Sequence, residues 1–115
     1  YARDVLEAMK QASALVPVTW ALEAANVIAR AEAAKLVTEA RSKTFIEMLD
    51  ALDIVADTAT FLQALSDTLH LARRYRLSSY DASYLELALR EGLPLATLDG
   101  DLQRAADRAG VKRFA

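Results

Sequence analysis

The stretch that decides the fold covers residues 77–102, LSSYDASYLELALREGLPLATLDGDL. Ser78 and Asp81 predict the start of a helix, because a serine followed three residues later by an acid is typical of a capping box. An apolar pattern of helical period follows, a glycine ends the helix, and residues 93–98 predict a short strand that ends on Asp99. A helix that opens on one acid and a strand that ends on another gather carboxylates at one sheet edge, where α/β folds bind ligands.

The length and composition predict one domain over residues 1–115, with 54% apolar residues to form its core. The absence of cysteine excludes disulfides and thiolate sites, and it fits a reducing cytoplasm. The net charge of −2 argues against a broadly basic nucleic-acid surface, so contact with RNA would need a local patch or metal ions. No apolar run approaches the roughly 20 residues of a membrane span. His70 is the only histidine, which argues against a Ser–His–Asp triad.

Helical and strand patterns alternate along the chain. Helices are predicted at 2–12, 20–34, 38–51, 59–75 and 101–109, besides the one that starts at 78–81, and strands at 14–19, 52–56, 93–98 and 111–114. This alternation predicts an α/β fold in which helices wrap a small parallel sheet. Two helices are expected to bury apolar stripes, formed by Phe45, Ile46, Leu49 and Leu52 in one and by Phe61, Leu62, Leu65, Leu69 and Ala72 in the other.

Four acids are candidates for chemistry: Glu23, Asp81, Asp99 and Asp101. Each also has an ordinary interpretation, because acids favour the first turn of a helix and aspartate is a common N-cap. Their joint position after strand ends and at helix starts is more informative. Carboxylates brought together repel one another or bind a cation, and oxygen ligands alone suit Mg²⁺ or Mn²⁺. The chemistry indicated is hydrolysis of a phosphodiester by water that a divalent ion activates.

Neighbouring residues have two open interpretations. Asn26, Ser79 and Thr97 either support the acids from a second layer or make ordinary capping and backbone hydrogen bonds. The basic residues Arg73, Arg74 and Arg76 either contact RNA phosphates or only complement the negative end of the helix at 59–75.

Three stretches carry a resemblance to a known family: VPVTWALEAANVIARA (16–31), RLSSYDASYLELALREGLPLATLDGDL (76–102) and AADRAGVKRF (105–114). The chain resembles the PIN-domain family, and more narrowly the VapC-type ribonuclease toxins of type II toxin–antitoxin systems. The resemblance implies a three-layer α-β-α fold and a cytoplasmic endoribonuclease that uses Mg²⁺ or Mn²⁺. It also implies an RNA substrate, a cognate antitoxin and a homodimer. The glutamate of the family's metal site falls on Glu23 and two of its aspartates on Asp81 and Asp99, with Asp101 assisting.

The family's first strand, which ends on a further aspartate, would precede Tyr1, and Asp4 lies in a helical pattern instead. We therefore expect the natural protein to carry an additional N-terminal segment. Without that strand, a gap is expected between the strands at 14–19 and 93–98, and metal binding and activity would be weakened.

Two alternatives stay open. The first is a non-catalytic interaction domain that binds a partner protein. The second is a phospho-acceptor receiver domain, for which neither Lys43 nor Lys112 is well placed.

Overall fold

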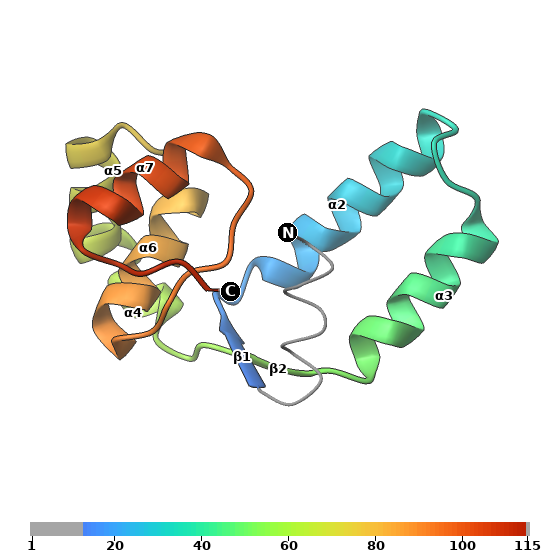
Figure 1. Cartoon of the computed structure of the whole chain (residues 1–115), viewed down its shortest axis with the longest axis horizontal. Coiled ribbons are helices and arrows are strands. Elements are labelled where there is room, and N and C mark those ends of the chain that lie inside the picture. Colours follow the sequence, from blue (N-terminus) through green and yellow to red (C-terminus); the bar gives the residue numbers. More distant parts are fainter. Residues whose placement is uncertain (1–12, 115) are drawn as a thin grey trace.

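The computed structural model of the chain describes residues 13–114 (Figure 1). In chain order its elements are β1 (Ser13–Val16), α2 (Trp20–Ala33), α3 (Glu39–Asp50), β2 (Asp53–Ala56), α4 (Thr60–Gln63), the π-helical segment η1 (Ala64–Thr68), α5 (Leu69–Tyr75), α6 (Ser79–Glu91) and α7 (Gly100–Ala109). The predicted starts and ends of α2, α3, α6 and α7 are confirmed to within about one residue. The helix predicted at 2–12 lies outside the described residues.

β1 and β2 form a two-stranded parallel sheet, in which Ser13 lies opposite Asp53 and Val16 opposite Ala56. Parallel strands need a crossover connection, and α2 and α3 provide it. Figure 1 shows this helix pair projecting to one side of the strands, while α4 to α7 gather on the other side. The chain therefore has an α/β fold, as predicted, although most of its residues are helical.

The buried core lies between α6 and α7. It consists of Leu85, Ala88, Leu95, Leu102, Ala105, Ala106 and Val111. α6 is central because both of its ends are well defined: the Ser78 side chain caps the first turn, and Gly92 ends the helix in the left-handed region at φ 65°. A glycine at φ 82°, Gly110, ends α7 in the same way. These local signals fix the two helices that carry Asp81 and Asp99.

The strands predicted at 93–98 and 111–114 are wrong. Within residues 13–114 these segments pair only through a single parallel bridge between Leu95 and Arg113. The Leu95 N–H donates to the Lys112 carbonyl (2.8 Å), and the Phe114 N–H donates to the Leu95 carbonyl (3.0 Å). Pro94 precedes the bridge and has no N–H to extend it. A strand needs a continuous neighbour, and these two segments offer each other only one residue.

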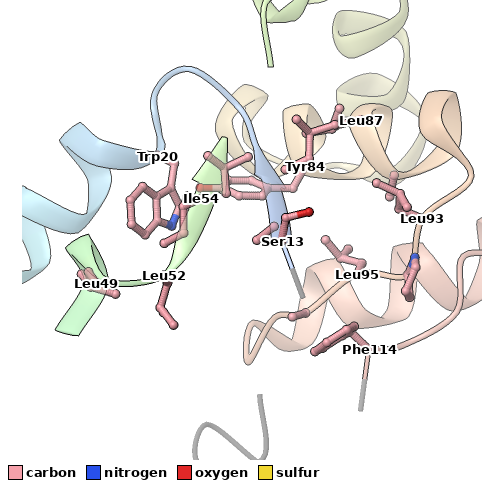
Figure 2. A pocket seen from close by; sticks show the side chains of 16 residues that line it. Ser13, Trp20, Leu49, Leu52, Ile54, Tyr84, Leu87, Leu93, Leu95 and Phe114 are labelled. Carbon is pink, nitrogen blue, oxygen red and sulfur yellow. The ribbon is translucent and has the colours of Figure 1, made fainter. Parts of the chain in front are cut away.

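A cavity of about 330 Å³ lies where the gap between the segments at 14–19 and 93–98 was expected. The four residues of β1 and residues 93–96 both line it. Figure 2 shows Trp20 of α2, Ile54 of β2 and Tyr84 of α6 around the same cavity. The cavity separates β1 from the core helices. Because its lining is mostly apolar, it offers no polar binding site.

The two predicted apolar stripes are buried only in part, since Leu49, Leu52, Leu69 and Ala72 are half-buried and the other members are exposed. Phe61, Leu62 and Leu65 are 86%, 74% and 87% exposed, and Phe45 and Ile46 are about half exposed. The helix predicted at 59–75 is also divided into α4, η1 and α5. The strand predicted at 52–56 is present as β2, but its only strand neighbour within the described residues is β1 and most of its residues are exposed. Helical periodicity identifies an apolar face, but it does not show what covers that face.

An ion-pair cluster joins the end of β2 to α6. Arg90 contacts Asp57 through Nη2 and Oδ2 (2.6 Å) and Glu86 through Nε and Oε2 (2.8 Å). The Asp57 and Glu86 side chains are only 7% and 5% exposed. The Arg90 hydrogen bond is the main reason that the pKa of Asp57 lies below its usual value. Asp57 also caps the following turn by accepting from the Ala59 N–H (3.2 Å).

In the part of the chain that the structure describes, no helix combines the length and the apolar character needed to cross a membrane.

Candidate active site

Glu23 lies in the first turn of α2 and is held from two sides. The Thr19 hydroxyl and the Tyr84 hydroxyl both donate to its Oε1 atom, at 3.1 and 3.3 Å. Thr19 occupies the N-cap position of α2, but its side chain caps no backbone N–H and binds Glu23 instead. Tyr84 comes from α6, so this contact fixes the start of α2 against that helix.

Tyr84 acts on Glu23 as a neutral donor. Burial is the first cause that raises the pKa of Tyr84, followed by the negative charge of Glu23, its hydrogen bond, and the charge of Asp81. A phenol with its usual pKa of 10.0 is already protonated at neutral pH, and the raised pKa extends the range in which Tyr84 remains a donor to more alkaline solutions. This role of Tyr84 was not predicted from the sequence. The signal was present, since residues 81 and 84 are three apart and share a face of the helix.

Asp81 is the third residue of α6 and is partly buried. Its N–H donates to the Ser78 hydroxyl (3.1 Å), which confirms the predicted helix start. Burial raises the pKa of the Asp81 carboxyl, and the negative charges of Asp99, Glu23 and Asp101 raise it further, while a hydrogen bond from Ser78 acts in the opposite direction. The fold therefore brings the first turns of α2, α6 and α7 close enough for their acids to repel one another.

Asp99 is the N-cap of α7, which confirms its ordinary interpretation. Its Oδ1 atom accepts from the Leu102 N–H (2.9 Å), and its own N–H donates to the Thr97 hydroxyl (3.1 Å). Within residues 13–114 its second oxygen, Oδ2, accepts no hydrogen bond. The cap thus orients the carboxylate and leaves one oxygen for another partner. Thr97 accepts from the backbone of this turn, which agrees with its interpretation as a residue that makes ordinary backbone hydrogen bonds.

The remaining predicted residues lie further from this group. Asp101 is exposed and forms an ion pair with Arg104 of the same helix, although its charge still reaches Asp81. Asn26 and Ser79 are exposed, and neither side chain forms a hydrogen bond within the described chain. Tyr84 and Thr19 hold Glu23, and no contact of Asn26 with Glu23 is present there.

The three predicted arginines lie at the end of α5. Arg73 and Arg74 are exposed in its last turn, and the Arg74 guanidinium lies 5.6 Å from the centre of the Tyr75 ring. Arg76 follows the helix in the left-handed region at φ 54°. Arg73 and Arg74 are placed to complement the negative end of the α5 dipole, which agrees with their ordinary interpretation.

The donor chemistry of this region suits a hard divalent cation, because it offers carboxylate oxygens whose mutual repulsion a cation would relieve. The spacing is looser than a ligand shell. Among residues 13–114, no three histidine, cysteine, aspartate or glutamate side chains lie close enough together to hold one metal ion. The acids of α2, α6 and α7 thus share an electrostatic field without forming a complete set of ligands.

Comparison with known families decides the relationship that this geometry suggests. The model of the PIN domain matches residues 1–108. The chain belongs to the PIN domain family. No curated protein and no solved structure matches it. PIN domains are generally nucleases, and those nucleases typically use divalent metal ions. A receiver domain, the weaker alternative from the sequence, is therefore not supported for this PIN domain.

Proposed function

We propose that this PIN domain is an endoribonuclease that depends on Mg²⁺ or Mn²⁺ and that Glu23, Asp81 and Asp99 are its acidic site residues. The observation that carries the proposal is the match to the PIN domain family over residues 1–108. The negative charges of acids from α2 and α7, which contribute to the raised pKa of Asp81, support the choice of site. Carboxylates that repel one another lower the stability of the fold unless a bound cation neutralises their charge. A divalent cation is the partner that such a group would bind, and RNA phosphates are the substrate that a cation would attract.

Different residues of the chain would have different roles at this site. Tyr84 and Thr19 hold one oxygen of Glu23, which fixes the carboxylate relative to α6. The N-cap bond of Asp99 uses Oδ1, which leaves the other carboxylate oxygen for a cation. When bound, a divalent ion supplies charge neutralisation at the phosphate and activation of water. Asp101, which is paired with Arg104, is assigned an assisting role.

The direct test is cleavage of single-stranded and structured RNA by the natural full-length protein. We expect cleavage within the RNA chain in Mn²⁺ or Mg²⁺, complete loss in excess EDTA, and recovery when the metal is restored. The reason is that the acid group cannot hold a phosphate without a cation between them. Cleavage that continues at the same rate in EDTA would contradict the proposal, as would intact RNA in both metals.

The resemblance to VapC-type toxins supports a further part of this proposal. We assign the protein a toxin role in the cytoplasm, with inhibition by a cognate antitoxin and assembly as a homodimer. The exposed apolar side chains Phe61, Leu62 and Leu65 support a protein partner, because large apolar patches on a monomer usually mark interaction surfaces.

The same exposed patch favours a second candidate function, a non-catalytic PIN domain that binds a partner protein. The looser spacing of the acids is in line with it. Metal binding distinguishes the two functions: the nuclease requires Mn²⁺ binding that depends on Asp81, and the interaction domain does not.

A further inference from the structure

A second cavity, of about 420 Å³, lies between the end of α5 and the outer face of α7. Three arginines line it: Arg76, which directly follows α5, and Arg104 and Arg108 from α7. Tyr75 and Asp101 also contribute to its walls. In Figure 1, α5 and α7 lie on the same side of the molecule, opposite α2 and α3. Two helices that are separated in the sequence thus bring several guanidinium groups to one hollow.

Two of these arginines are available for a ligand. Arg104 forms an ion pair with Asp101, and the other acid in the cavity wall, Asp107, pairs with Arg113 (3.1 Å). Arg76 and Arg108 form no ion pair with any residue in the range 13–114. Two unpaired guanidinium groups over one cavity make a site for an anion that carries more than one charge.

The cavity adjoins the acid group. Asp101 lines the cavity, and its charge also contributes to the raised pKa of Asp81. From Asp101, the helix α7 carries Arg104 and Arg108 away from the acids. At 1.5 Å per residue, Arg108 lies about 10 Å further along the axis. That length corresponds to about three nucleotides of a stacked strand. A strand whose scissile phosphate lies at the acids could therefore reach Arg108 with a phosphate about three nucleotides away.

We propose that this cavity binds backbone phosphates of the RNA strand that flank the cleaved bond, with Arg76 and Arg108 as the main contacts. The inference rests on the proposed ribonuclease function and specifies where its substrate binds. Of the three arginines predicted from the sequence, only Arg76 belongs to this site, and Arg108 joins it from α7. The structural alternative is that Arg108, in the last turn of α7, only complements the negative end of that helix's dipole.

The backbone at Arg76 allows a clean test. Arg76 has φ 54°, a conformation that glycine adopts without strain, so Arg76→Gly removes the charge and relieves the backbone. Lys35 provides a matched control, because it has φ 58°, also follows a helix and also carries one positive charge. It follows α2, on the opposite side of the sheet from α5 and α7 (Figure 1). Lys35→Gly therefore repeats the same chemical change away from the cavity.

The experiment measures binding of a fluorescent single-stranded RNA to the full-length protein in EDTA, where no cleavage occurs. We expect Arg76→Gly and Arg108→Ala each to weaken binding about 5- to 10-fold. Log affinity falls as log salt concentration rises, and each change should make this dependence shallower by about 0.7, the value for one phosphate on a single strand. Lys35→Gly should change neither quantity.

Three results would overturn the inference. The Arg76→Gly/Arg108→Ala double variant could bind RNA as the parent does, or Lys35→Gly could weaken binding equally, which would indicate general charge attraction. Arg108→Ala could lower only the melting temperature, which would indicate a helix-end role. By contrast, a parent that binds through these arginines but cuts no RNA in any metal would support this site and contradict the proposed nuclease function.

Discussion

Replacing Asp99 with asparagine is expected to reduce RNA cleavage by at least about 100-fold in Mg²⁺ or Mn²⁺, with little change in stability. Asparagine is as good an N-cap as aspartate, so the Oδ1 contact to the Leu102 N–H is kept. What is lost is the negative charge on the free carboxylate oxygen. The measurement is the cleavage rate of a defined RNA by the full-length protein, together with its melting temperature.

The matched control for this variant is Asp67→Asn. Asp67 is an exposed aspartate in the π-helical segment η1, and it does not contribute to the raised pKa of Asp81. We expect cleavage at the parental rate. If Asp99→Asn cleaves as fast as Asp67→Asn, then Asp99 is only a helix cap and is not a site residue.

The second large effect concerns stability. Arg90→Ala is expected to lower the free energy of unfolding by about 3–5 kcal/mol, because it leaves Asp57 and Glu86 buried without their cation. The measurement is chemical denaturation of the full-length protein. Arg90→Lys keeps the charge but not the forked geometry, so it should show an intermediate loss even if the alanine variant does not fold.

The pH dependence of this cluster follows from the lowered pKa of Asp57. A carboxyl whose folded-state pKa lies below its usual 3.8 stabilises the fold above that value. The contribution is lost as the pH falls from about 4 through the folded-state pKa.

The control for Arg90→Ala is Arg113→Ala, which breaks an ion pair whose side chains are 55% and 53% exposed and should cost at most about 1 kcal/mol. An equal loss in Arg90→Ala and Arg113→Ala would show that the buried cluster does not stabilise the junction of β2 and α6.

The helices that carry the site were predictable because their signals are local. The Ser78 cap, Gly92 and Gly110 define the ends of α6 and α7 from the sequence alone. Strands depend on a neighbour, and residues 93–98 have the composition of a strand but pair only at Leu95. The pattern of the segment 59–75 likewise gave no indication that part of it is π-helical.

The candidate site was predictable only in part, for a related reason. Acids at the ends of elements can be located from the sequence, and the negative charges of Asp99, Glu23 and Asp101 contribute to the raised pKa of Asp81. Their role as site residues stays a prediction. The contact from Tyr84 to Glu23 joins residues 61 positions apart, so no local pattern contains it. The pairing of Arg90 with Asp57 was missed for the same reason. Long-range contacts of this kind depend on how α6 packs against the other elements, and local sequence patterns do not predict that packing.

The central proposal is that the acids of α2, α6 and α7, which do not form a complete set of ligands as placed in residues 13–114, together bind one divalent ion when it is supplied. Thermal unfolding with Mn²⁺ tests it most directly. Because the pKa of Asp81 is raised, its charged form lowers stability once the pH exceeds that pKa, so Asp81→Asn should melt at a higher temperature than the parent at neutral pH without metal. Millimolar Mn²⁺ should raise the melting temperature of the full-length parent and leave that of Asp81→Asn almost unchanged. Equal shifts in both proteins, or no shift in the parent, would contradict the account.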